Sequence, residues 1–164
     1  MIFVTVGNAT QPFPRLLEAV DRLAGEGVFP GEAVHIQSGN NPGFRPAHCR
    51  QEAFLSLEQF EDMVQQADLI ISHAGAGTLL QVLQAGKVPV VMPRRREYGE
   101  IIDEHQMELV KALAAEGRIV PAFSPEELPP AIQQARTSSG RPATGPSRML
   151  ALVAEAIEQL RRRS

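Results

Sequence analysis

The stretch DLIISHAGAGTLLQVLQAGKVPVVMP, residues 68–93, decides the fold class. An apolar run, a turn of small residues, a segment with apolar residues at helical spacing and a second apolar run follow one another. We expect a strand at Leu69–Ser72, a helix at Thr78–Ala85 and a strand at Val88–Met92. This order is typical of the strand–helix–strand unit of a parallel sheet.

The same alternation continues on both sides of this stretch. Further strands are expected at Ile2–Val6, Val34–Gln37 and Arg118–Val120, and further helices at Arg15–Leu23, Glu58–Gln66, 105–117 and Glu126–Gln134. Residues 136–146 resemble a flexible connection, and residues 147–164 a C-terminal helix. The chain, residues 1–164, is therefore expected to form a single α/β domain, a Rossmann-like parallel sheet with helices on both faces.

Composition excludes several classes of protein. The net charge of −3 and the 5% of aromatic residues argue against nucleic-acid binding. The single cysteine cannot form an internal disulfide, no apolar run is long enough to span a membrane, and the N-terminus lacks the features of a signal peptide. The four histidines lie on different expected elements, so no metal site is predicted. A cytoplasmic location is the default expectation.

The turn after the strand at Leu69–Ser72 is the strongest candidate site. Small residues there let a ligand approach the backbone, and the following helix offers free N–H groups and a dipole that favour a phosphate. A plain strand-to-helix corner explains the same residues equally well. The turn consists of Gly75, Ala76, Gly77 and Thr78. Leu80 stands where a dinucleotide fingerprint needs Gly or Ala, and the Gly-Lys-Ser/Thr of a phosphate loop is absent.

Three other loops are expected at the same edge of the sheet, where ligands of open α/β sheets bind. The first two contribute Gly7 and Asn8, and Ser38 and Gly39, although turn chemistry accounts for them nearly as well. The third, PRRREYGEIIDEHQ at 93–106, brings arginines that suit a phosphate or a carboxylate. Its polar end, including Glu104, His105 and Gln106, suits either helix capping or sugar hydroxyls.

Taken together, these motifs resemble the glycosyltransferase family 28 C-terminal domain, the donor-binding half of GT-B enzymes. The resemblance covers FVTVG, ADLIISHAGAGT, AGKVPVVMPR and YGEIIDEHQMELV. It is nearest to short, free-standing members of the family. These include the catalytic subunit of the dolichol-linked N-acetylglucosaminyltransferase and bacterial exopolysaccharide glycosyltransferase subunits, and PRRREYGE…DEHQ points to the bacterial branch.

The resemblance implies a UDP-sugar site. Gly75-Ala76-Gly77-Thr78 would hold the diphosphate, bordered by His73. Gln81 stands where related enzymes place a Glu that binds the ribose, so the charge is missing here. The other residues implied or proposed for the UDP-sugar are Gly7, Asn8, Ser38, Gly39, Arg95, Glu104, His105 and Gln106.

The implied reaction is an inverting transfer of a hexose or hexuronic acid from a UDP-sugar to a polyprenyl-diphosphate-linked saccharide in polysaccharide biosynthesis. It implies no cofactor and no metal. The acceptor half of a GT-B enzyme does not fit into 164 residues, so the general base is expected on a membrane-anchored partner subunit. That partner would hold the chain at the inner face of the membrane. His105 and Gln106 are the candidates in this chain for contacts near the reacting sugar, and a homo-oligomer is an arrangement open to the isolated chain. The alternative is a non-catalytic nucleotide-sugar-binding or scaffolding subunit.

Overall fold

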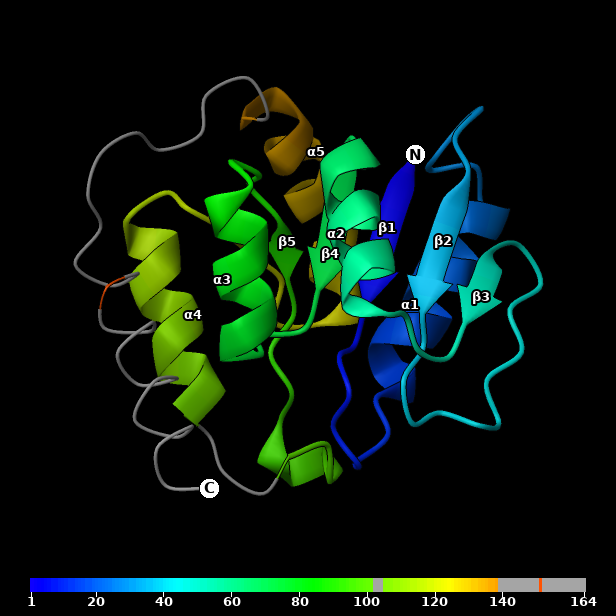
Figure 1. Ribbon diagram of the computed structural model, residues 1–164, viewed down its shortest axis with the longest axis horizontal. Helices are drawn as coiled ribbons and strands as arrows, with labels where there is room; N and C mark the ends of the chain where they lie inside the picture. The colour runs from blue at the N-terminus through cyan, green and yellow to red at the C-terminus, as the bar shows by residue number, and fades with distance from the viewer. Residues whose placement is uncertain (102–104, 139–150, 152–164) are drawn as a thin grey trace.

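Every neighbouring pair of strands in the sheet is parallel (Figure 1). The computed structural model describes residues 1–101, 105–138 and 151, which form a six-stranded sheet in the order β3-β2-β1-β4-β5-β6. The strands are β1 (Ile2–Thr5), β2 (Val34–Gln37), β3 (Arg50–Glu52), β4 (Leu69–Ser72), β5 (Val90–Val91) and β6 (Val120–Pro121). The helices are α1 (Pro14–Gly25), α2 (Leu57–Gln66), α3 (Ala76–Gln84), α4 (His105–Ala115) and α5 (Leu128–Ser138), with 3₁₀ turns η1 (Arg96–Tyr98) and η2 (Pro125–Glu127).

The central strands are apolar on both faces because helices cover both. Ile2 and Val4 of β1 pack with α1 and α5, whereas Phe3 packs with Val64 of α2 and Val82 of α3. The helix α4 joins α3 on this second face. The period-2 alternation of a strand thus sends successive side chains into two separate cores. The prediction of a Rossmann-like sheet with helices on both faces is confirmed.

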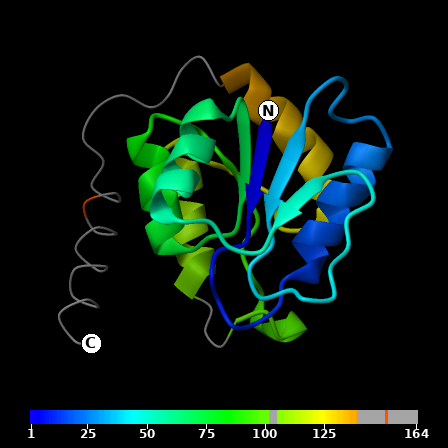
Figure 2. The same cartoon turned by 45° about the vertical axis from the view of Figure 1, so that its right-hand side comes forward.

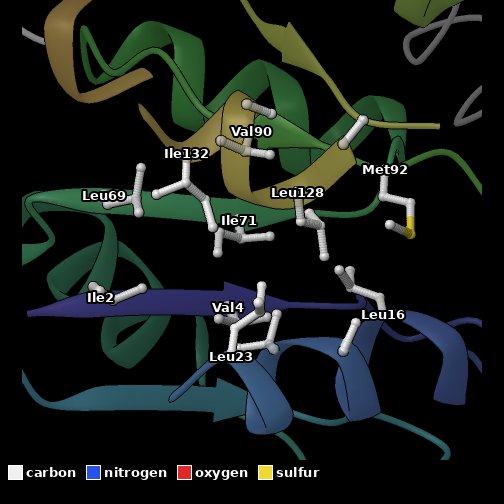
Figure 3. Close-up of a cluster of buried hydrophobic side chains, with 14 of the residues drawn as sticks. Ile2, Val4, Leu16, Leu23, Leu69, Ile71, Val90, Met92, Leu128 and Ile132 are labelled. Atoms are coloured by element: carbon white, nitrogen blue, oxygen red, sulfur yellow. The ribbon is translucent and has the colours of Figure 1, made fainter. Parts of the chain in front are cut away.

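The larger core lies between the sheet and the pair α1 and α5. Figure 3 shows Ile2, Val4, Leu69 and Ile71 of the two central strands facing helix side chains across this layer. The other labelled residues of the view come from the helices, from β5 and from the residue after it, and are Leu16, Leu23, Leu128, Ile132, Val90 and Met92. This packing fixes β1 beside β4, and those two strands support the candidate site.

Local signals explain where two of the helices begin. Pro14 occupies the first turn of α1, where a missing N–H costs no hydrogen bond. Ser56 caps α2: its Oγ accepts from the Gln59 amide at 3.1 Å, and the Ser56 amide donates to Gln59 Oε1 at 2.9 Å. This capping box places the side chains of the first turn of α2 at the mouth of the candidate site.

The expected elements differ from the observed ones in the bounds of several strands and helices, for example at β5 and β6, and three further differences concern whole elements or the site. The strand β3 was not predicted because its three residues, Arg-Gln-Glu, form an exposed edge without an apolar pattern. The helix α3 begins at Ala76 and not at Thr78, with Gly75 as its N-cap. The helix α5 continues to Ser138, so 136–138 are helical and the predicted connection is wrong there. Its remainder, and the predicted helix at 147–164 apart from Ala151, lie outside the described residues.

Within the described ranges, none of the helices combines the length and the apolar character that crossing a bilayer requires.

Candidate functional site

The candidate site lies at the carboxyl ends of β1 and β4, the two strands at which the chain switches sides of the sheet. From β1 the chain continues into α1 on one face, and from β4 it continues into α3 on the other. A crevice opens at such a switch point because the two following loops diverge. A cavity of about 410 Å³ occupies this position, a volume within the range of small-molecule sites. In Figures 1 and 2 the carboxyl ends of the strands share one end of the molecule with η1 and the β1–α1 loop.

The structure brings half of the predicted residues together around this cavity. They are Gly7, Asn8, His73, Gly75, Gly77, Thr78 and Gln81. Ala76 belongs to the first turn of α3 beside them but is not in the lining. The β1–α1 loop and the start of α3 therefore both line this cavity.

Other predicted residues lie outside the cavity lining. Ser38 Oγ accepts a hydrogen bond from Gln51 Nε2 at 2.9 Å. Gly39 is needed for packing, because a Cβ there would come within 2.4 Å of the Gly7 carbonyl oxygen. Gln106 Oε1 accepts from the Arg94 amide at 3.4 Å. His105 is the first residue of α4, and Glu104 falls outside the described residues.

The glycines around His73 serve the protein's own packing more than the approach of a ligand. A Cβ on Gly7 would lie 2.5 Å from Nε2 of His73, and one on Gly75 would lie 2.2 Å from its Cε1. The imidazole thus fits between two glycines, and Gly7 also has a positive φ of 71°. Gly77 differs because a Cβ there would meet nothing within 4 Å. Of the glycines in the motif, Gly77 is the one whose backbone faces open space.

His73 is a neutral, fixed hydrogen-bonding group. Burial and then the nearby charge of Arg94 lower the pKa of His73 to about 3. Its Nδ1 accepts from the Gly75 amide at 3.2 Å, so the proton of the neutral ring resides on Nε2. Nε2 lies 3.3 Å from Thr78 Oγ1 and donates to it. The hydroxyl of Thr78 keeps its own proton for another acceptor.

The N-terminus of α3 supplies the positive end of the cavity. The first intrahelical donor is the Leu79 amide, which bonds the Gly75 carbonyl at 2.9 Å. The amides before it in the first turn have no helical acceptor, and no acidic residue stands in that turn to neutralise the helix dipole. Together with the Thr78 hydroxyl, these amides suit an anion such as a phosphate.

The opposite wall was not predicted. Leu55, Leu57 and Phe60 line it, and they come from the β3–α2 loop and the first turn of α2. The capping signal at Ser56 and Gln59 predicted a helix start but not a cavity wall. An apolar wall opposite an anion site suits a ligand that carries both a flat ring and phosphates.

Gln37 was also missed, although it is the polar end of a buried strand. Its Nε2 lies 3.3 Å from the Gly7 carbonyl, 3.2 Å from Asn8 Oδ1 and 3.2 Å from the Ala53 carbonyl. Its Oε1 accepts a short hydrogen bond from the Thr5 hydroxyl. Gln37 therefore joins two of the loops that enclose the cavity, and a buried polar residue closing the strand VHIQ was the signal that could have found it.

The three arginines at 94–96 have different surroundings. Arg94 is 1% exposed and donates to backbone carbonyls. Arg95 is half-buried and pairs with Glu97 at 2.8 Å, while Arg96 is exposed. None of the three is in the cavity lining. Within the described ranges, no group of three His, Cys, Asp or Glu is arranged to hold a metal ion.

Comparison with solved structures agrees with this geometry. The glycosyltransferase of kitacinnamycin aligns with 96% of this chain and 39% of its own, at a TM-score of 0.64 and 16% identity. MurG from Acinetobacter baumannii aligns with 93% of this chain and 48% of its own, at a TM-score of 0.56 and 20% identity. Fold and site together define a Rossmann-like α/β domain of the kind found in GT-B glycosyltransferases.

Sequence comparison identifies the family. The model of the glycosyltransferase family 28 C-terminal domain matches residues 1–160. The chain belongs to this family. It is 32% identical over 125 residues to the UDP-N-acetylglucosamine transferase subunit ALG13 of Homo sapiens (72% of this chain, 10% of the relative). It is 33% identical over 126 residues to the subunit of the same name from Yarrowia lipolytica (69% of this chain, 60% of the relative). The chain thus spans less than two thirds of the length of these relatives.

Proposed function

We propose that this chain is the donor-binding subunit of a UDP-sugar-dependent, inverting glycosyltransferase. The observation that carries the proposal is the cavity of about 410 Å³ with a helix N-terminus at one side and an apolar wall at the other. Membership of the glycosyltransferase family 28 C-terminal domain and the similarity to subunits named UDP-N-acetylglucosamine transferase support it. The acceptor in this proposal is a polyprenyl-diphosphate-linked saccharide used in polysaccharide biosynthesis.

The two walls of the cavity suit the two parts of UDP. The diphosphate would be bound by the first-turn amides of α3 and by the hydroxyl proton of Thr78. The uracil ring would lie against Leu55 and Phe60, and the ribose would face Gln81. Glu104, His105 and Gln106 would approach the transferred sugar.

The chemistry asked of this chain is the stabilisation of the leaving diphosphate. When an acceptor hydroxyl attacks the anomeric carbon from the opposite face, the C–O bond to the β-phosphate breaks and negative charge develops on UDP. Fixed N–H groups and the dipole of α3 stabilise that charge without having to reorganise. His73 is not suited to act as the general base, because its pKa of about 3 makes it a weak proton acceptor. The base in our proposal belongs to the partner.

The partner in this proposal is a membrane-anchored subunit that binds the acceptor, which would hold this chain at the inner face of the membrane. Phe54, Leu57 and Tyr98 are 53%, 63% and 60% exposed, and they lie on the loops and first turns at the carboxyl edge of the sheet. Large exposed apolar side chains near a site support a role as a protein contact. A transfer assay with and without the partner, encoded by a neighbouring reading frame, tests this dependence. Full activity of the isolated chain would contradict it.

Calorimetry with Gly77→Asp tests the diphosphate site. The new carboxylate would stand beside the bound phosphates, yet an acidic residue in the first turn of a helix does not destabilise it. The matched control is Gly43→Asp, because Gly43 also has no atom within 4 Å of an added Cβ and lies outside this cavity. We expect UDP binding by the wild type and by the control, and none by Gly77→Asp. Equal binding of UDP, ADP and GDP would instead indicate a general nucleotide-binding domain.

The donor sugar in our proposal is a hexose or a hexuronic acid, and Arg95 distinguishes them. A hexuronate carboxylate would compete with Glu97 for the Arg95 guanidinium. If Arg95→Ala lowers transfer from UDP-glucuronate much more than from UDP-glucose, the acidic donor is supported. An equal loss on both donors removes the carboxylate from the argument.

The second candidate function is a non-catalytic nucleotide-sugar-binding or scaffolding subunit. The observation that favours it is Gln81, which lines the cavity at the position proposed to face the ribose and carries no charge. A complex that binds UDP-sugar and assembles with the partner but transfers no sugar would support this second function.

A further inference from the structure

Arg94 is a fully buried charged residue that the proposed chemistry does not use. It lies shortly after β5, beyond Met92 and Pro93, is 1% exposed and has its guanidinium 4.9 Å from the centre of the Phe13 ring. Burying a charge is costly and seldom increases stability, so the contacts that Arg94 makes need a separate explanation.

Those contacts join two loops that are far apart in sequence. Nη2 donates to the Val6 carbonyl at 2.9 Å, and Nη1 donates to the Gln11 carbonyl at 2.7 Å. These two carbonyls stand at the start and near the end of the β1–α1 loop, which carries Gly7 and Asn8. Nη1 also donates to the Glu100 carbonyl at 3.0 Å, in the segment that leads to α4. One rigid guanidinium therefore sets the separation of both loops.

The neighbours of Arg94 keep its position fixed. Its amide donates to Gln106 Oε1 at 3.4 Å, which links it to α4. The Glu100 carboxylate is held by Arg15, with Nε–Oε2 and Nη2–Oε1 distances of 3.0 and 2.9 Å. That ion pair holds the segment whose carbonyl Arg94 binds. These residues form one hydrogen-bonded cluster, which consists of Arg94, Arg15, Glu100 and Gln106. Within it, Arg94 is the residue that donates to carbonyls of the β1–α1 loop.

We propose that Arg94 is a positioning residue for donor binding: it holds the β1–α1 loop, with Gly7 and Asn8, at a fixed distance from the segment that leads to His105 and Gln106. The inference rests on the proposed UDP-sugar binding, and Arg94 itself does not line the cavity. Geometry is the reason for an arginine here, because a planar fork reaches several carbonyls at once and a lysine ammonium does not.

The charge of Arg94 has a second, separable effect. It acts electrostatically on His73, which is buried between Gly7 and Gly75, and it adds to the burial that lowers the pKa of His73. A lysine at position 94 would retain this effect while losing the span between the loops. Methionine would lose both, so the two variants separate geometry from charge.

The test compares Arg94→Lys and Arg94→Met with wild type and with Lys87→Met in the full chain. Lys87→Met removes another cation that donates to two backbone carbonyls, those of Gln65 and Ala67, but Lys87 lies outside the cavity lining, so this variant controls for lost stability. The measurements are amide hydrogen exchange of Gly7 and Asn8 without ligand, UDP affinity by calorimetry, and the NMR titration of His73.

We expect faster exchange at Gly7 and Asn8 in both Arg94 variants, with UDP binding about 10- to 100-fold weaker. Lys87→Met should retain both properties. His73 should titrate at higher pH in Arg94→Met but not in Arg94→Lys, a result that a purely structural role would not produce. Wild-type exchange and affinity in Arg94→Lys would overturn the inference and leave the proposed function standing. A wild type that binds no UDP would overturn the proposed function, and the exchange of Gly7 and Asn8 would still decide whether Arg94 positions the loop.

Discussion

At the scale of single residues, the motif SHAGAGT has two kinds of glycine. Gly75 has a conformation open to any residue, but an added Cβ would lie 2.2 Å from His73 Cε1. Gly77 lies in the first turn of α3 with open space beside it. Glycine at position 75 therefore makes room for the His73 ring, whereas glycine at position 77 leaves the backbone open to a ligand.

This difference predicts opposite effects on stability. Gly75→Ala should lower the free energy of unfolding by about 1–3 kcal/mol, because a buried ring has to move. Gly77→Ala should change it by less than about 1 kcal/mol and in the stabilising direction, since alanine is the better helix former. Urea unfolding of both variants measures the contrast. Equal destabilisation by the two substitutions would contradict the packing role of Gly75.

His73 makes stability depend on pH. In the unfolded chain its pKa is about 6.5, whereas in the folded chain burial and Arg94 lower its pKa to about 3. The unfolded state therefore binds more protons below pH 6.5, and the contribution of His73 to stability, present at pH 7, is lost progressively as the pH falls towards 3. From pH 7 to pH 5 the loss should be about 2 kcal/mol.

Urea unfolding at pH 7, 6 and 5 measures this loss, and His73→Gln is the control. Glutamine does not titrate, so the variant should lose less stability over the same range even if it is less stable at pH 7. Identical slopes for wild type and His73→Gln would show that His73 is not the group responsible.

At the scale of the elements, the end of β2 connects the loops around the cavity. The amide of Gln37 spans the β1–α1 loop and the β3–α2 loop through the carbonyls of Gly7 and Ala53. Neither loop has a regular backbone structure at that point to hold its position. The side chain of one strand residue therefore joins these two loops, and the Gly39 amide also donates to the Ala53 carbonyl, at 2.8 Å.

Gln37→Glu tests this connection with a substitution of nearly equal shape. It replaces an NH₂ donor by an oxygen, which removes the Nε2 donor from its three acceptors and places a carboxylate among them, although the Ala53 carbonyl still accepts from the Gly39 amide. We expect a loss of about 2–4 kcal/mol in stability and weaker UDP binding. Gln51→Glu, in the neighbouring strand β3 and outside this cavity, is the matched control and should retain UDP affinity. Wild-type affinity in Gln37→Glu would contradict the role of Gln37.

At the scale of the whole molecule, one core couples the two halves of the sheet. The cluster on the α1 and α5 face includes residues from β2 and β1 through to β6. The site residues of α3 are attached to the other face. Stability and ligand binding are thus supported from opposite sides of the same sheet, as Figure 3 illustrates for the larger core.

Ile132→Ala should therefore lower stability without altering the site. Ile132 is 3% exposed in the larger core, and its truncation should cost about 2–5 kcal/mol. UDP affinity of the folded fraction, measured by calorimetry well below the unfolding temperature, should match the wild type. A specific loss of affinity would show that the α5 face contributes to the cavity.

The sequence by itself determined the strand–helix alternation and the parallel sheet, and it indicated the loop at 72–78 as a candidate site, because periodicity and small-residue turns are local properties of the chain. The tertiary structure alone decided which residues surround that loop. It placed Arg94 against Val6, 88 positions away, and Gln37 against Gly7, 30 positions away. It also placed Gly7 and Gly75 against the same imidazole ring, that of His73. Hydrogen-bond partners and burial depend on such distant contacts. No local pattern could therefore show that Arg94 is buried in a hydrogen-bonded cluster, or that Gly77 has open space beside it.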